Sequence, residues 1–305
     1  MIKPDLSVNL CGVTLKNPII PASGTFGYGR DFVKFYDIST LGAVSAKGVT
    51  PLPRCGNPPI RIAETPSGIL NSVGLQNPGI DEYIKTELPW MTEQGAVVIT
   101  NISGNTVEEY AMMAEKLDKT DTAMIEVNVS CPNVHCGGKV FGADPKVINE
   151  VAVAVKKATS KPVIIKLSPN VTDIVEMALA AEAGGADSVS LINTLTGMAI
   201  DINTRRPILA NLTGGMSGPA VRPVALRMCY QVAQAVNIPV VGMGGIMTGE
   251  DAVMFLLAGC TAVQVGTANL SDPMACPKII EGLEQYMVKN GIAKVSELIG
   301  AIIID

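Results

Sequence analysis

The chain is 305 residues long, with 48% hydrophobic, 17% charged and only 4% aromatic residues. The high apolar content excludes a disordered chain, and a net charge of −5 without a block of like charges argues against nucleic acid or an anionic membrane as a partner. We therefore expect a folded protein that binds a small molecule.

The first residues and the cysteines indicate the compartment. The opening segment MIKPDLSVNL lacks the charged and apolar regions of a signal peptide, and no run of 18 apolar residues occurs. The seven cysteines contain no CxxC pair, which fits neither a disulfide framework nor an iron–sulfur cluster. Cys131 and Cys136 lie on either side of His135, but a second pair of metal ligands is missing. We predict a cytoplasmic protein without a bound metal.

In chain order, a hairpin precedes a regular alternation of strands and helices. Residues 5–15 alternate in polarity around a turn at Cys11-Gly12, which predicts the hairpin. Short apolar runs typical of buried parallel strands follow at residues 18–22, 43–46, 96–100, 124–130, 163–167, 187–192, 239–243 and 262–265. Helical patterns between them include residues 144–159, 172–184 and 248–259, the last two with threonine caps at Thr172 and Thr248.

Eight strands that alternate with helices fit two α/β architectures, a closed barrel or an open doubly wound sheet. The count of eight without a distinct edge strand favours a (β/α)8 TIM barrel that forms one domain over residues 1–305. Two segments, 49–77 and 193–219, are longer than ordinary βα loops and rich in turn residues. We expect both to lie over the carboxyl end of the barrel as a lid and a pocket wall.

Polar residues or glycines stand at the carboxyl end of every predicted strand, where the active sites of such barrels form. These are Ser23, Lys47, Asn101, Asn128 with Cys131, Lys166, Asn193 with Thr194, Gly244-Gly245 and Gly266-Thr267. Lys166 follows a run of apolar residues, so it needs an anion or an acceptor there unless its side chain extends to the barrel mouth. Lys47 also needs an anion or an acceptor unless its side chain extends to the barrel mouth, although the residues before it are less apolar.

The residues around Cys131 allow two interpretations of this cysteine. A free cysteine is often a buried small hydrophobe. The neighbouring Pro132 and the asparagines at 128 and 133 instead favour a polar pocket in which the thiol has a restricted direction.

The glycines after the last two strands, with Gly214, Gly215 and Gly218 from the preceding loop, are typical of a phosphate site or of flexible turns. Asn71, Asn128 and Asn193 can each donate and accept hydrogen bonds at the edge of a heterocycle. Together with two lysines and a thiol, they predict a planar, anionic ligand.

The sequence resembles the class 1 dihydroorotate dehydrogenases, specifically the NAD-linked 1B type, over nearly its whole length. The motifs that carry the resemblance are PASGTFGYG, SAKGVT, NSVGLQNPG, IEVNVSCPNVHCGGKVFGADP, VIIKLSPN, INT, GGMSGPA and GMGGI. The cysteine loop followed by GGKVFG is similar to the 1B type. The 1A type continues differently, and class 2 has serine there and an N-terminal extension.

The resemblance implies one FMN per chain and oxidation of (S)-dihydroorotate to orotate, with Cys131 as the general base that removes the C5 proton. The substrate would be held by Lys47, Asn71, Ser72, Val73, Gly74, Leu75, Asn128, Asn193 and Thr194. The residues expected around FMN are Ser23, Lys47, Gly48, Asn101, Asn128, Lys166, Ile192, Gly218, Gly244, Gly245, Gly266 and Thr267. Lys166 would contact the flavin ring near N1 and O2.

The resemblance also implies partners. A separate subunit with FAD and a [2Fe–2S] cluster would pass electrons to NAD+ in a heterotetramer of two copies of each chain, built on a homodimer of this chain. Two alternatives remain: a barrel like that of dihydropyrimidine dehydrogenase, which acts on uracil or thymine, and a non-catalytic barrel subunit that binds a phosphorylated ligand. The charge of the substrate distinguishes the first alternative, because orotate has a carboxylate and uracil and thymine do not. The colour of the purified protein distinguishes the second, because an FMN enzyme should be yellow.

Overall fold

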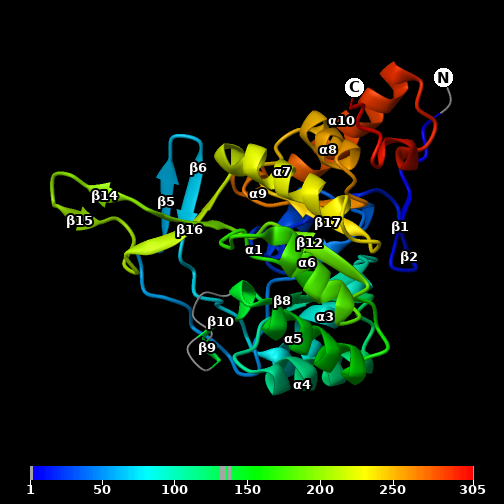
Figure 1. The fold of residues 1–305 in the computed structure, drawn as a ribbon. Coiled ribbons are helices and arrows are strands. Elements are labelled where there is room, and N and C mark those ends of the chain that lie inside the picture. Colours follow the sequence, from blue (N-terminus) through cyan, green and yellow to red (C-terminus); the bar gives the residue numbers. More distant parts are fainter. Residues whose placement is uncertain (1–2, 131–134, 137–138, 305) are drawn as a thin grey trace.

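Figure 1 shows the computed structural model, which describes residues 3–130, 135–136 and 139–304. Its centre is a parallel sheet formed by β3 (Ile19–Pro21), β4 (Val44–Ser45), β7 (Val98–Ile102), β8 (Met124–Asn128), β11 (Val163–Lys166), β12 (Ser188–Leu191), β17 (Val240–Met243) and β18 (Ala262–Val265). The spatial order is β3-β18-β17-β12-β11-β8-β7-β4. The Gly42 amide donates to the Ile19 carbonyl at 3.0 Å, which joins the two ends of the sheet. The predicted TIM barrel is confirmed.

Every residue of these eight strands is buried, as expected for a parallel sheet that is covered by helices outside and filled by side chains inside. The helices are α1 (Ser23–Phe26), α2 (Ile80–Glu82), α3 (Leu88–Glu93), α4 (Val107–Asp118), α5 (Pro145–Ala158), α6 (Ile174–Ala183), α7 (Arg222–Ala233), α8 (Gly249–Leu257), α9 (Ala268–Ser271) and α10 (Ala275–Asn290). Around the barrel, α4 packs on α5, α5 on α6, α6 on α7, α7 on α8 and α8 on α10. Within the described ranges, no helix is long and apolar enough to cross a membrane.

The helix caps agree with the sequence in two cases and differ in one. Asp144 caps α5 through the Lys146 amide, and Thr248 forms a capping box with Asp251 at the start of α8. The predicted cap of α6 at Thr172 is wrong, because Asp173 accepts hydrogen bonds from the amides of Val175 and Glu176. A carboxylate accepts both bonds and also interacts favourably with the helix dipole.

The predicted N-terminal hairpin is also confirmed. Its strands β1 (Val8–Leu10) and β2 (Val13–Leu15) pair antiparallel across a two-residue turn. Both turn residues, Cys11 and Gly12, have positive φ angles of 53° and 85°, which suits the right-handed twist of a tight hairpin.

A second, antiparallel sheet stands where the sequence predicted two long irregular loops. It consists of β5 (Ile62–Thr65), β6 (Gly68–Asn71), β13 (Leu195–Met198) and β16 (Thr213–Ser217), in the order β13-β16-β6-β5. The pairing of β6 with β16 joins segments 49–77 and 193–219 into one structure. The strands are short, and three of the four contain glycine. β5 and β6 form a local hairpin, but the pairing of β6 with β16 joins segments distant in sequence, which local patterns did not reveal.

This sheet and the ribbon of β14 (Ile200–Asp201) and β15 (Arg206–Pro207) project from the barrel on the side opposite to β1 and β2 (Figure 1). A further short ribbon pairs β9 (His135–Cys136) with β10 (Lys139–Val140).

Candidate active site

A cavity of about 640 Å³ opens at the carboxyl ends of the barrel strands. Its volume falls within the range of small-molecule and cofactor sites, roughly 300–1,000 Å³. The antiparallel sheet supplies one wall through residues such as Ile62, Ile69 and Thr213. The two long segments therefore do lie over the site, as the sequence predicted, but as paired strands.

The cavity brings together every described residue that the sequence analysis assigned to substrate or cofactor. These are Ser23, Lys47, Gly48, Asn71, Ser72, Val73, Gly74, Leu75, Asn101, Asn128, Lys166, Ile192, Asn193, Thr194, Gly218, Gly244, Gly245, Gly266 and Thr267. Their individual roles stay predictions. Cys131 lies outside the described residues, but Ser130 and Gly142, on either side of that segment, both line the cavity.

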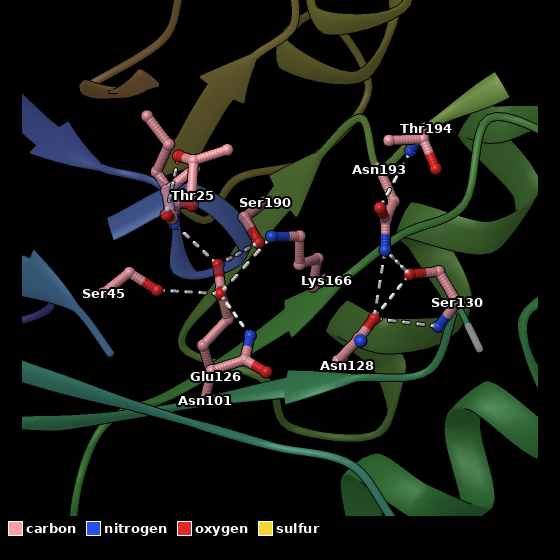
Figure 2. Close-up of polar contacts among 12 residues, drawn as sticks. Thr25, Ser45, Asn101, Glu126, Asn128, Ser130, Lys166, Ser190, Asn193 and Thr194 are labelled. Atoms are coloured by element: carbon pink, nitrogen blue, oxygen red, sulfur yellow. Dashed lines mark hydrogen bonds and ion pairs between the residues drawn. The ribbon is translucent and has the colours of Figure 1, made fainter. Parts of the chain in front are cut away.

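Below the cavity, a buried carboxylate is the centre of a polar layer inside the barrel. Glu126 is 0% exposed and accepts hydrogen bonds through both oxygens (Figure 2). The donors come from four other strands: Ser45 Oγ at 3.1 Å, Asn101 Nδ2 at 2.6 Å, Ser190 Oγ at 2.8 Å and Gln264 Nε2 at 2.7 Å. Lys166 Nζ lies 3.7 Å from Glu126 Oε2. We call these six side chains the Glu126 layer.

The charge of Glu126 is maintained by its neighbours. Burial alone would raise the pKa of a carboxyl group, because water no longer solvates the ion. The Lys166 ammonium and the hydrogen bonds from Ser190, Asn101 and Gln264 outweigh burial and lower the pKa of Glu126. The carboxylate is therefore ionised at neutral pH, and Lys166 has the anionic partner that its apolar strand demanded.

Lys47 lines the same cavity in a different electrostatic situation. Within the described part of the chain, no acidic side chain forms an ion pair with its ammonium. Burial is the main cause that lowers the pKa of Lys47, and the positive charges of Arg61 and Lys166 lower it further. The negative charge of an anionic ligand in the cavity would offset both effects, so the Lys47 ammonium is suited to receive a carboxylate.

The amide side chains at the cavity wall form a connected network around the end of β8. Asn128 Oδ1 accepts hydrogen bonds from the Ser130 amide at 3.2 Å and from Asn193 Nδ2 at 3.3 Å (Figure 2). Asn193 Nδ2 also donates to Ser130 Oγ, and its Oδ1 accepts from the Thr194 amide at 2.8 Å. These bonds fix Asn128 and Asn193 relative to one another, which prepares an array of donors and acceptors for a ring with N–H and C=O groups.

Glycine is required in the turn after β17. Gly244 and Gly245 have φ angles of 130° and 76°. A Cβ atom on Gly245 would lie only 2.7 Å from the Arg222 Cβ and 2.8 Å from the Gly218 carbonyl oxygen. After β18, by contrast, a Cβ on Gly266 would meet nothing nearer than the Ala22 Cβ at 3.9 Å. The backbone of both turns is accessible from the cavity, as a phosphate site in such a barrel requires.

Several residues of this region were not predicted from the sequence, and three of them show why. Glu126 could have been found from the sequence, because it is a charged residue inside an apolar strand, as Lys166 is. Ser130 was taken as part of the strand, although its hydroxyl belongs to the amide network. Asn170 links the loop after β11 to β13, since its Nδ2 donates to the Thr194 carbonyl and its Oδ1 accepts from the Thr196 amide, both at 2.9 Å. Nothing local to Asn170 indicates this role.

Comparison with known proteins gives the family. The model of the dihydroorotate dehydrogenase family matches residues 5–287. The chain belongs to the dihydroorotate dehydrogenase family. Among its relatives, a protein of Geotalea uraniireducens is 59% identical over 304 residues, which cover 99% of this chain and 100% of the relative.

Relatives from Geobacter sulfurreducens and Alkaliphilus metalliredigens are 58% and 55% identical, each over 99% of this chain and at least 99% of their own length. All three carry the name dihydroorotate dehydrogenase B (NAD(+)), catalytic subunit. The resemblance to the NAD-linked members of the dihydroorotate dehydrogenase family is thereby confirmed.

Proposed function

We propose that this chain is a catalytic subunit that oxidises (S)-dihydroorotate to orotate in pyrimidine biosynthesis and holds FMN in the cavity above the Glu126 layer. The observation that carries the proposal is the convergence of all the described predicted site residues on one cavity at the barrel mouth. The full-length similarity to NAD-linked catalytic subunits supports the same reaction. The cytoplasmic location predicted from the sequence is part of the proposal.

The cavity suits FMN in its volume and in the chemistry of its lining. The turns after β17 and β18 offer backbone that a phosphate can approach, and Lys166, Asn101 and Asn128 provide polar groups for the flavin ring. When bound, FMN supplies the acceptor for the hydride that leaves C6 of dihydroorotate. This chain would contribute the base, Cys131, which removes the C5 proton, and the side chains that orient the substrate.

The substrate would be held between Lys47 and the amide network. Lys47 would receive the carboxylate, while Asn71, Asn128 and Asn193 would bind the ring edges. Asn71 already donates to the Gly215 carbonyl at 3.2 Å, which fixes it on the antiparallel sheet. A neutral pyrimidine such as uracil offers no carboxylate to Lys47, and this difference favours dihydroorotate over the substrates of a dihydropyrimidine dehydrogenase.

Replacement of Lys47 by methionine is expected to weaken orotate binding about ten- to hundredfold, because one charge-assisted hydrogen bond contributes roughly 1.5–3 kcal/mol. Titration of the flavin absorbance with orotate measures this change. Binding of uracil, which has no carboxylate, serves as the control and should change less than threefold. Equal losses for both ligands would show that Lys47 does not bind the carboxylate.

Electron transfer to NAD+ would need a partner. The names of the relatives include NAD(+) and the words catalytic subunit, and they support an assembly with a second chain. We propose that this partner carries FAD and a [2Fe–2S] cluster and that two copies of each chain assemble around a homodimer of the catalytic subunit.

The deciding experiment adds dihydroorotate anaerobically to the purified yellow chain and then adds NAD+ with and without the co-purified partner. The proposal predicts flavin bleaching by dihydroorotate alone and NAD+ reduction only with the partner. A colourless chain would indicate a non-catalytic barrel, and bleaching by dihydrouracil but not by dihydroorotate would indicate a dihydropyrimidine dehydrogenase.

A further inference from the structure

The hydrogen bonds and the ion pair of the Glu126 carboxylate are formed with side chains inside the barrel. Its side chain is 0% exposed and does not line the cavity, so it cannot touch a ligand there. Three of its donors, Ser45, Ser190 and Gln264, are also fully buried and do not line the cavity. Only Asn101 and Lys166 belong both to the Glu126 layer and to the cavity lining.

Stability alone does not explain this layer. Replacing a buried ion pair with well-packed apolar residues is often neutral or stabilising, because the desolvation cost of two charges disappears. The interiors of such barrels are ordinarily filled with branched apolar side chains. A buried carboxylate with four hydrogen-bond donors and one ammonium group therefore indicates a function at the cavity that its partners reach.

Lys166 is the partner through which Glu126 acts on the cavity. The lysine is 5% exposed, and its Nζ lies 3.7 Å from Glu126 Oε2, too far for a hydrogen bond. None of the described residues accepts a hydrogen bond from Nζ, so its N–H groups are available to a ligand. The carboxylate, in contrast, is held rigidly by Ser45, Asn101, Ser190 and Gln264.

We propose that Glu126 is a positioning residue that anchors the Lys166 ammonium below the flavin ring and cancels most of its charge. This inference rests on the proposed function, because it concerns FMN. The pair presents FMN with a hydrogen-bond donor that is held near Glu126 by charge attraction and carries little net charge. An oxidised flavin ring is neutral, and reduction adds negative charge near N1. The positive charge of Lys166 alone would therefore favour reduced FMN, and the negative charge of Glu126 weakens this preference.

The test is the ratio of the affinities of Glu126→Gln for reduced and oxidised FMN, compared with the same ratio in the wild type. The midpoint potential of each FMN-loaded protein, measured at one fixed pH, gives this ratio. Glutamine keeps the size of the side chain and removes its charge. We expect the ratio to rise at least tenfold, which corresponds to about 30 mV for a two-electron couple. The affinity for oxidised FMN should change less than threefold.

Ser190→Ala is the matched control, because it removes a hydrogen bond from the same carboxylate without changing any charge. Its ratio should stay within threefold of the wild type. A rise of less than tenfold or a lowered ratio in Glu126→Gln, or an equal rise in Ser190→Ala, would overturn the inference. If the wild type binds no FMN, the proposed function itself fails, and the two failures are thus distinguishable.

A second variant keeps the test decisive if Glu126→Gln does not fold. Glu126→Gln combined with Lys166→Gln removes both buried charges and leaves no unpaired ion. Because the wild-type pair is nearly neutral, the affinity ratio should fall less than tenfold in this double variant. A fall of tenfold or more would mean that Lys166 presents its charge to FMN without compensation in the wild type, which would contradict the role of Glu126.

Discussion

Cys131→Ala is expected to keep FMN bound while dihydroorotate reduces the flavin about 10²–10⁴-fold more slowly, the usual range for loss of a general base. A thiol has an ordinary pKa of about 8.5, so part of it is thiolate near neutral pH, whereas alanine cannot accept a proton at all. Anaerobic stopped-flow measurement of flavin bleaching gives the rate constant directly. Retention of the flavin spectrum after gel filtration shows that the site is intact.

Two further variants define the role of the thiol. Cys55 is exposed and does not line the cavity, so Cys55→Ala should reduce its flavin at the wild-type rate. Cys131→Ser keeps a hydroxyl in place of the thiol but provides a far weaker base, and its rate should fall between those of alanine and cysteine. Near-normal flavin reduction in Cys131→Ala would remove Cys131 from the role of base.

The barrel was predictable because its determinants are local. Each strand is a short apolar run, such as residues 163–167, and each run ends in a polar residue or glycine. Parallel strands buried on both faces require this composition, and helical periodicity between them requires crossover connections. The positions of Lys166 and Gly244 at strand ends followed from topology, since all parallel strands of a barrel end at the same face.

The parts that escaped prediction depend on contacts between distant segments. Strands β6 and β16 pair with each other although Asn71 and Gly215, which lie opposite one another, are far apart in the sequence. Neither strand alone shows a clear alternation of apolar and polar residues. Glu126 could be recognised as unusual, but its five partners come from five different strands, so no window of sequence contains them. The cap of α6 was missed for a local reason, since Asp173 and Thr172 are adjacent cap candidates and only the backbone geometry decides between them.

Lys166→Ala is expected to lose roughly 3–5 kcal/mol of unfolding free energy at neutral pH, the usual cost of leaving one ion of a buried pair without its partner. FMN retention should fall as well, because Lys166 lines the cavity. Denaturant unfolding at a fixed FMN concentration measures the first effect, and flavin fluorescence after gel filtration measures the second.

The pH dependence identifies the carboxylate as the cause. In the wild type the pKa of Glu126 lies below the ordinary value of 4.5, so its contribution is present above that value and is lost as the pH falls through the folded-state pKa. Without Lys166, burial would raise the pKa of Glu126, and folding would then require a proton. The difference in stability between Lys166→Ala and the wild type should therefore be larger at about pH 8 than at about pH 5.

The matched control for this variant carries Glu126→Gln in addition to Lys166→Ala. Both proteins lack the lysine, so they differ only in the carboxylate of Glu126. If that charge causes the instability, the double variant should regain most of the lost unfolding free energy and its stability should vary less with pH. If the double variant is as unstable as Lys166→Ala, the loss arises from the missing lysine stem, and Glu126 then tolerates burial without its counter-ion.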